Sequence, residues 1–225
     1  MVEMEKRTYR LTGFTPMLGS SPADPYVRTN YIASKAPDPV ATAEEEREYL
    51  LEREENKITV FLRNPKNGAL MLLDYQVMGF IKGSLESLTA QTGIKAPRGK
   101  VDKFVFVSPR KITICREDGS PIKQDDPEAA EPCERPLRAM TMKGERVSLA
   151  ASEQIHDPWQ ITFTVSLLPN ERSKVSASIK WEDIERALDY GEMRGLGQFR
   201  NGGYGRFTWE RVDDQEEEKV KRHGA

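Results

Sequence analysis

The sequence predicts an α+β protein with a ferredoxin-like (RRM-like) split βαβ core, a β-rich insertion and an N-terminal loop and helix insertion. Two observations predict this class. Strand and helix patterns follow one another as strand, helix, strand, strand, helix, strand once the insertions are set aside. Both helix patterns have one apolar face, which suits helices packed on a sheet. The elements are expected at residues 7–13, 79–91, 101–107, 161–168, 181–193 and 206–212.

The first half of the core follows from side-chain periodicity. Tyr9 and Leu11 alternate with polar residues, so they share one face of the first strand. Ile81 and Leu85 recur at helical spacing and predict the first helix, residues 79–91, which ends before a glycine. A short apolar run follows as the second strand.

The second half begins with the clearest strand of the sequence. Its inward positions are Ile161, Phe163, Val165 and Leu167. The next helix has Trp181, Ile184 and Leu188 on one face, with acidic residues in its first turns, where the helix dipole favours them. Phe207 and Trp209 mark the last strand.

The chain is expected to form a single domain over residues 1–212. Its core is expected in residues 7–13, 79–107 and 161–212. The first insertion, residues 14–73, is rich in turn residues and contains a helix predicted over 41–55. The second, residues 109–158, is a β-rich arm with a hairpin predicted over 138–150. Residues 213–225 form a charged tail that is expected to be flexible.

Composition bounds the function classes. With 37% hydrophobic and 31% charged residues among 225, the chain predicts a globular protein with a polar surface. No apolar run approaches the roughly 18 residues that a membrane span needs. The two cysteines, Cys115 and Cys133, are read as reduced thiols in a cytoplasmic protein. A net charge of -2 argues against indiscriminate nucleic-acid binding but permits a local basic face.

A glycine-rich segment, residues 195–207, joins the second helix to the last strand. It contains five glycines, two arginines and three aromatic residues. Glycine permits positive φ and close backbone approach, and arginine offers a planar fork of donors that matches phosphate. The segment therefore predicts a surface for a nucleic-acid backbone. The alternative is a long turn in which Asn201-Gly202 is an ordinary turn dipeptide.

A second candidate lies at the expected beginning of the first helix. Lys82 and Gly83 would stand where free backbone donors and the helix dipole favour an anion. The alternative is that Gly83 only permits close helix packing. Together the two regions give the candidate nucleic-acid-binding residues Lys82, Gly83, Arg194, Gly197, Arg200, Asn201, Gly202, Gly203, Tyr204, Gly205 and Arg206.

These candidates have distinct expected roles. Arg194, Arg200 and Arg206 would contact phosphates, with glycine amides as additional neutral donors. Tyr204 or Phe199 would stack on bases. The alternative for Tyr204 is an aromatic side chain that anchors the loop to the core.

Three short segments resemble motifs of one family. They are Leu11-Thr-Gly-Phe-Thr-Pro-Met-Leu-Gly-Ser20, Tyr75-Gln-Val-Met-Gly-Phe-Ile-Lys-Gly-Ser-Leu85 and Gly197-Gln-Phe-Arg-Asn-Gly-Gly-Tyr-Gly-Arg206. They occur in the order seen in the RAMP superfamily, the RNA-binding proteins of CRISPR systems, and resemble its effector-backbone branch most. Met78-Gly79-Phe80 replaces the usual Pro-Gly-Ser, and Asn201 stands where serine is common. The chain therefore resembles a divergent relative.

The resemblance implies a protein of antiviral defence that binds single-stranded RNA, such as a guide RNA, and assembles with copies of itself or related subunits. RNA-cleaving relatives use a histidine or a loop aspartate. This chain offers His156 and His223, and no motif selects Asp24 or Asp38. No zinc spacing, Walker motif or nucleophile elbow occurs, so the sequence predicts binding without catalysis, metal or cofactor. The alternatives are a structural protein of a mobile element and an endoribonuclease that uses His156.

Overall fold

A four-stranded antiparallel sheet forms the centre of the computed structural model, which describes residues 4–22, 58–123, 126, 131–141, 144–168 and 179–212. Its strands are β1 (Glu5–Gly13), β7 (Val105–Ser108), β11 (Trp159–Leu167) and β12 (Phe207–Arg211). Their order in the sheet is β12-β1-β11-β7, and all three pairings are antiparallel. This is the order of the ferredoxin-like split βαβ fold, so the predicted fold class is confirmed.

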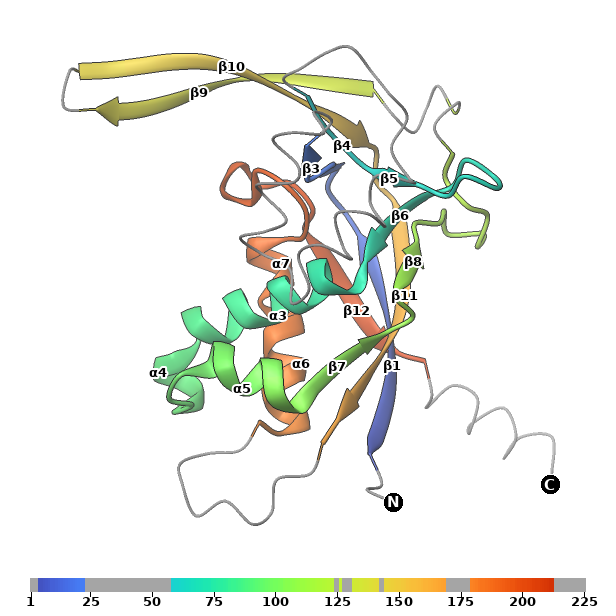
Figure 1. Cartoon of the computed structure of the whole chain (residues 1–225), viewed down its shortest axis with the longest axis vertical. Coiled ribbons are helices and arrows are strands. Elements are labelled where there is room, and N and C mark those ends of the chain that lie inside the picture. The colour runs from blue at the N-terminus through green and yellow to red at the C-terminus, as the bar shows by residue number, and fades with distance from the viewer. Residues whose placement is uncertain are drawn as a thin grey trace.

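Helices cover one face of this sheet, as Figure 1 shows. They are α3 (Asp74–Ser87), α4 (Thr89–Thr92), α5 (Pro97–Phe104), α6 (Trp181–Asp189) and α7 (Gly191–Arg194). Tyr9 and Leu11 of β1 and the inward residues of β11 are buried beneath them, as the alternation predicted. The opposite face is more polar; there, the hydroxyl oxygens of Thr8 and Thr164 lie 3.0 Å apart.

The first helix begins earlier than the predicted start at residue 79. The preceding strand β6 (Leu70–Leu73) ends directly at α3. Gln76 closes the helix start, because its side-chain oxygen accepts the backbone N–H of Leu73 at 2.8 Å. The second strand also differs from the prediction for residues 101–107, because α5 extends to Phe104 and only the residues after it pair with β11.

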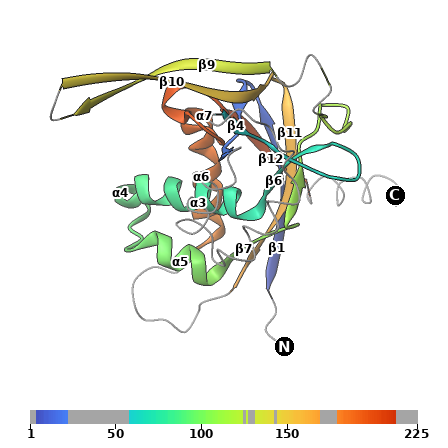
Figure 2. The same ribbon diagram turned by 45° about the horizontal axis from the view of Figure 1, so that its top comes forward.

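The β-rich insertion contains a long hairpin made of β9 (Glu131–Thr141) and β10 (Gly144–Ile155). The hairpin predicted over 138–150 is the outer part of this longer one, whose register runs from Gly144↔Thr141 to Gln154↔Glu131. Figure 2 shows it extending past the helical layer. Its base pairs with the short strands β2 (Met17–Leu18) and β4 (Ile58–Val60), and β3 (Ser21–Pro22) pairs with β4.

A buried ion pair fixes the base of this hairpin. Arg63 lies in β5 (Leu62–Arg63), which pairs with β6, and β6 in turn pairs with β8 (Lys111–Thr113). The guanidinium of Arg63 pairs with Glu153 of β10, and both side chains are 5% exposed. Glu153 also accepts the backbone N–H of Phe61 at 2.9 Å. The two insertions are thus joined through a desolvated charge pair next to the core.

Some predictions concern residues outside the described ones: the helix over 41–55, the tail 213–225, and Asp24, Asp38 and His223. Of the helices in the described part of the chain, none has the length and apolar character that a bilayer crossing requires.

Candidate nucleic-acid interface

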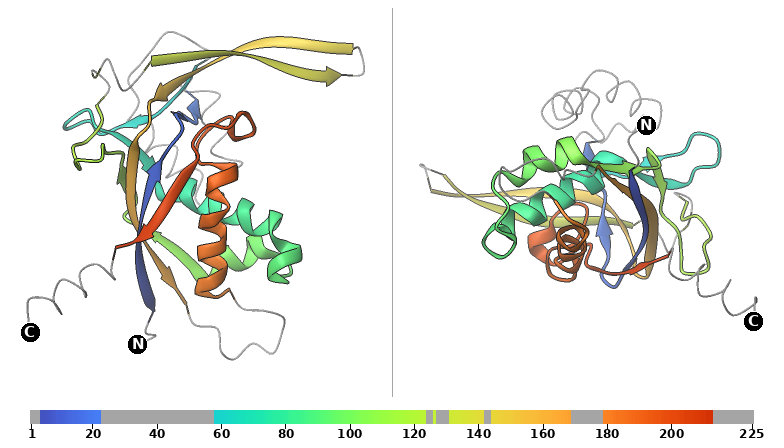
Figure 3. Two further views of the ribbon diagram at one scale, coloured as in Figure 1. Left: turned by 180° about the vertical axis from the view of Figure 1, so that it is seen from behind. Right: turned by 90° about the horizontal axis from the view of Figure 1, so that it is seen from below.

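The glycine-rich segment forms a loop that folds back on itself between α7 and β12. Gly195, Gly197, Gly203 and Gly205 all have positive φ, between 71° and 88°. The N–H of Leu196 donates to the carbonyl of Gly205 at 2.8 Å. A Cβ at Gly205 would collide with the Leu196 carbonyl oxygen, so the closed loop requires glycine there. Figure 3 shows the loop from behind, beneath the hairpin.

The loop is docked on the segment that follows β1. Gly205 donates its N–H to the carbonyl of Pro16 at 2.7 Å, and Gln198 donates to that of Leu18 at 3.2 Å. The N–H of Arg206 donates to the hydroxyl of Thr15 at 2.8 Å. Two of the three motif segments are therefore in direct contact.

The same hydrogen bonds change the expected role of the glycine amides. Gly205 donates to Pro16, and the N–H groups of Gly195, Gly202 and Gly203 donate to carbonyl groups within their own loop or the preceding helix. A backbone N–H carries one hydrogen, which these bonds already use. These four N–H groups are therefore already used within the fold, and a contribution of glycine amides to phosphate binding stays a prediction.

A cavity of about 420 Å³ lies where the three motif segments meet. One wall comes from the end of α7, residue 194, and from the loop, residues 196–201. Another comes from the first half of α3, with Tyr75, Gln76 and Gly79. Ser20 contributes from the end of the first motif, and Arg135 from the hairpin. The cavity thus brings together residues that are more than a hundred positions apart in the chain.

Three arginines line this cavity: Arg135, Arg194 and Arg200. No aspartate or glutamate is among its described lining residues. The guanidinium of Arg194 is held by a hydrogen bond to the side-chain oxygen of Asn201. Because Coulomb interactions are stronger away from bulk water, such a cavity favours an anionic ligand.

Arg135 is the least solvated of these cations. The residue is 7% exposed, and its guanidinium lies 4.8 Å from the centroid of the Phe199 ring. It donates to the hydroxyl of Ser152 at 2.9 Å. Its Nε has no hydrogen-bond partner, and no carboxylate pairs with it, among the residues that the structure describes. Burial of a charge is costly unless an opposite charge or hydrogen bonds compensate it.

Sequence reasoning missed Arg135 and Gln76. Arg135 lies outside the hairpin predicted over 138–150, and its pairing in the longer hairpin brings it to the cavity. Gln76 belongs to a motif segment but was not selected. Its side chain bridges Leu73 and Ser20, with its Nε2 donating to the Ser20 hydroxyl at 2.7 Å. The signal that could have selected Gln76 is its position three residues after the end of a buried strand, where a glutamine side chain caps the start of α3.

Four predicted residues of the loop do not line the cavity. Gly202 and Gly203 lie at the outer turn, and Gly205 and Arg206 lead into β12. Their contact with nucleic acid stays a prediction.

Tyr204 does not line the cavity either and contacts the hairpin instead. Its hydroxyl lies 3.6 Å from the Cys133 sulfur, and its ring centroid is 5.9 Å from that of Phe199. The hydrogen bond to Cys133 and partial burial raise the pKa of Tyr204 above its usual value. Tyr204 thus connects the loop to the hairpin, whereas the alternative expected an aromatic that anchors the loop to the core.

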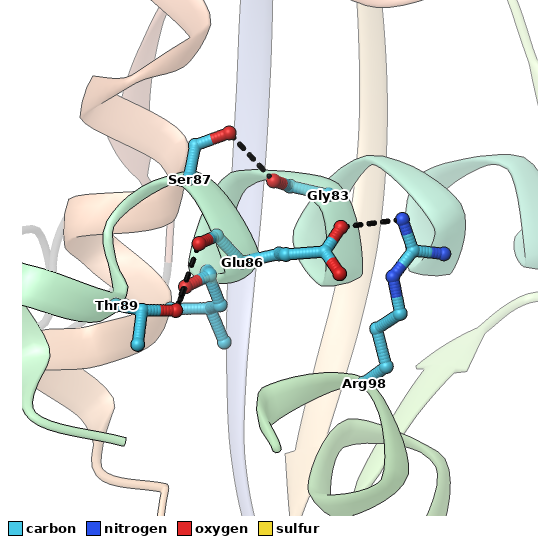
Figure 4. Close-up of polar contacts among 6 residues, drawn as sticks. Gly83, Glu86, Ser87, Thr89 and Arg98 are labelled. Carbon is cyan, nitrogen blue, oxygen red and sulfur yellow. Dashed lines mark hydrogen bonds and ion pairs between the residues drawn. The ribbon is translucent and has the colours of Figure 1, made fainter. Parts of the chain in front are cut away.

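The prediction that Lys82 and Gly83 lie at a helix start is wrong. Both are in the second half of α3, where backbone N–H groups are within the helix ladder. The Gly83 carbonyl accepts the Ser87 hydroxyl at 3.1 Å, as Figure 4 shows beside the pair of Glu86 and Arg98. A Cβ at Gly83 would meet nothing within 4 Å, so helix packing does not require this glycine.

Lys82 is paired with Asp102 and lines a separate cavity of about 640 Å³ between α3, α5 and β7. A role for Lys82 in binding RNA stays a prediction, at a site distinct from the loop.

Catalytic groups are not gathered at the arginine-lined cavity. His156 is exposed and follows β10, and it is not among the cavity-lining residues. Within the described ranges, no cluster of three or more histidine, cysteine, aspartate or glutamate side chains is arranged to hold a metal ion. Both cysteines are free thiols.

Comparisons with known proteins find similarity among solved structures. No family model matches the chain, and no curated protein matches it. Among solved structures, it is similar to a chain in the structure described as "Cryo-EM structure of the Type III-B Cmr-beta bound to cognate target RNA". The match has a TM-score of 0.46 and 9% sequence identity, and it covers 92% of this chain and 59% of that one. This chain thus spans about three fifths of the length of the longer protein. With so low a sequence identity and TM-score, the match assigns neither family nor function.

Proposed function

We propose that this protein binds single-stranded RNA without cleaving it, as a divergent relative of the RAMP superfamily. One observation carries the proposal: the cavity between the glycine loop, α3 and the hairpin is lined by three arginines and, among described residues, by no carboxylate. The three segments that resemble RAMP motifs all reach this cavity. Guide RNA as the ligand, and assembly with copies of itself or related subunits, are parts of the same proposal.

The proposed mechanism divides the contacts by chemistry. Arg194, at the end of α7, and Arg200, on the loop, would pair with phosphate oxygens, which gives affinity without reading sequence. Phe199 is 36% exposed and lines the same cavity, so its ring is available for stacking on a base. Such contacts tolerate any base, because every base has a stacking face.

The test is RNA affinity measured at several salt concentrations. We expect Arg194→Ala/Arg200→Ala to weaken binding of a single-stranded RNA and to reduce the salt slope by about 0.7 for each phosphate that is no longer neutralised. Arg98→Ala is the matched control, because this arginine is 62% exposed, pairs with Glu86 and does not line the arginine-lined cavity. Equal affinity and an equal slope for the double variant and wild type would rule out the proposed site.

The second candidate is a structural or interaction protein of a mobile element that keeps the fold for assembly. It is favoured by the loop geometry: Gly195 and Gly205 are required by close backbone approach, so their presence needs no ligand. Met193 beside the loop is 66% exposed, as a protein contact would use. This candidate predicts no co-purifying nucleic acid, and loss of assembly when residues 138–150 are removed. The 260/280 nm absorbance ratio of the purified protein separates the two.

A further inference from the structure

We propose that the arginine-lined cavity binds a terminal phosphate monoester of a nucleotide, such as an RNA end, rather than an internal phosphodiester. This inference rests on the proposed function, since it names the part of the RNA that enters the cavity. Three properties of the cavity support it: its charge, its buried cation and its shape.

The charge of the cavity exceeds what one internal phosphate supplies. An internal phosphodiester carries one negative charge. A phosphate monoester carries about −1.5 to −2 at neutral pH and presents three acceptor oxygens. Arg135 and Arg194 line this space, and neither forms an ion pair with a carboxylate among the residues that the structure describes. The doubly charged group compensates these cations better.

Arg135 carries the cavity charge that is least exposed to solvent. Its residue is 7% exposed yet lines the cavity, so an anion inside the cavity is positioned to pair with it. Ser152 and the Phe199 ring hold the guanidinium in place from the hairpin and the loop. A cation fixed in this way needs no rearrangement on binding, which favours recognition of a small, highly charged group.

The shape of the site suits a chain end. A volume of about 420 Å³ falls within the roughly 300–1,000 Å³ of ligand pockets, whereas backbone binding needs only an open track. An internal phosphate has the nucleotide chain on both sides, and a terminal one has it on one side only. The terminal group can therefore enter further toward a buried residue such as Arg135.

Three polar side chains of the wall, Gln76, Ser20 and Asn201, have hydrogen bonds that favour their use as donors. The Gln76 side-chain oxygen is occupied by the Leu73 N–H, and its Nε2 bonds the hydroxyl oxygen of Ser20. A hydroxyl and an amide nitrogen each have a further hydrogen to donate beyond the Gln76–Ser20 bond, so these two groups can serve as donors to a ligand. The side-chain oxygen of Asn201 is likewise occupied by Arg194. A phosphate monoester accepts hydrogen bonds at all of its oxygens and matches this donor-rich wall.

The experiment compares RNA ends on the full-length protein. One single-stranded RNA is prepared with a 5′-phosphate, with a 3′-phosphate and with hydroxyl groups at both ends, and affinities are measured by fluorescence anisotropy with an internal label. We expect one phosphorylated end to bind about tenfold tighter or more than the hydroxyl form, the scale of charge-assisted hydrogen bonds. Arg135→Gln should abolish this preference, and Arg98→Ala should retain it.

Two further measurements make the test decisive. Thermal unfolding shows whether Arg135→Gln is folded. If it is not, Arg194→Ala replaces it, because Arg194 ends α7 and its side chain is hydrogen-bonded to Asn201 of the loop rather than to the hairpin. Calorimetry with a nucleoside monophosphate, the matching nucleoside and inorganic phosphate then identifies the source of the monoester. Binding of the monophosphate but not the nucleoside, without RNA binding, supports a phosphate-monoester site for free nucleotides and overturns the RNA function.

Other outcomes separate the two proposals in the opposite direction. RNA binding that depends on Arg194 and Arg200 but is equal for phosphate and hydroxyl ends overturns the end-recognition inference and leaves the RNA function standing. Absence of binding by both RNA and the monophosphate overturns both.

Discussion

The guanidinium of Arg135 lies 4.8 Å from the ring centroid of Phe199, and this contact joins the base of the hairpin to the glycine loop. The hydrogen-bond contact between Cys133 and Tyr204 connects the same two elements. Phe199 has a φ of 51°, which is uncommon for a residue with a side chain. The loop conformation thus presents this ring to the arginine and to the cavity at once.

Replacing Phe199 by alanine tests the stacking role of that ring. We expect Phe199→Ala to lower affinity for single-stranded RNA by roughly 1–3 kcal/mol, the usual value of one base-stacking contact. Anisotropy titrations at fixed salt measure this. Phe106→Ala is the control, because Phe106 is similarly exposed but lies on β7 and does not line the arginine-lined cavity. Equal reductions in affinity for the two variants would remove the special role of Phe199.

Gly205→Ala tests whether the loop needs glycine for its own closure. The added methyl group would collide with the Leu196 carbonyl oxygen, at a residue whose φ is 71°. We expect a decrease of more than about 1 kcal/mol in the free energy of unfolding, measured by urea denaturation. Gly83→Ala is the counterpart: it lies inside α3 with open space around it, so we expect an increase of roughly 0.5–1 kcal/mol.

The buried pair of Arg63 and Glu153 is expected to be strongly coupled. Glu153→Gln leaves the Arg63 charge buried without its counterion, and we expect a decrease of about 3–5 kcal/mol in unfolding free energy. The double variant Arg63→Met/Glu153→Leu removes both charges and should recover most of that decrease. Denaturation of wild type and the two variants measures the coupling. A double variant less stable than Glu153→Gln would contradict this account.

The free energy of unfolding is expected to depend on pH in the alkaline range because of Tyr9. Burial, and then the nearby Glu185 carboxylate, raise the pKa of Tyr9 well above its usual value. The folded state therefore disfavours the phenolate, and the unfolded chain loses this proton first, near pH 10. The contribution of Tyr9 is fully present below about pH 10 and decreases as pH rises above it. Tyr9→Phe should flatten the fall in unfolding free energy above that pH, as measured by denaturant titrations.

The order of the core elements was predictable because each strand has one buried face. The alternation over β11 placed Ile161 and Phe163 inward, and the structure agrees. Boundaries were less predictable. The start of α3 depends on Gln76 capping the turn after a buried strand, a contact that apolar periodicity does not reveal. The beginning of β7 depends on its pairing with β11, which lies far away in the sequence.

The site was partly predictable for a related reason. Arg194, Gly197, Arg200 and Asn201 lie within one short segment of the chain, and all four line the cavity. Arg135 acquires its position from the pairing of β9 with β10. Ala150 lies opposite Arg135 in the register, and the Arg135 guanidinium donates to the hydroxyl of Ser152. A local pattern carries no record of such a contact.

The base of the hairpin lies at the cavity, and Gly144 lies at its far end. The two ends are therefore separated by most of the length of β10. Strand β10 rises about 3.3 Å per residue, so a small tilt near Ser152 becomes a displacement several times larger at the tip. The buried pair of Arg63 and Glu153 holds the base of the hairpin against β5. Because Arg135 belongs to this hairpin and also lines the cavity, the base of the hairpin and one wall of the cavity form a single structural unit.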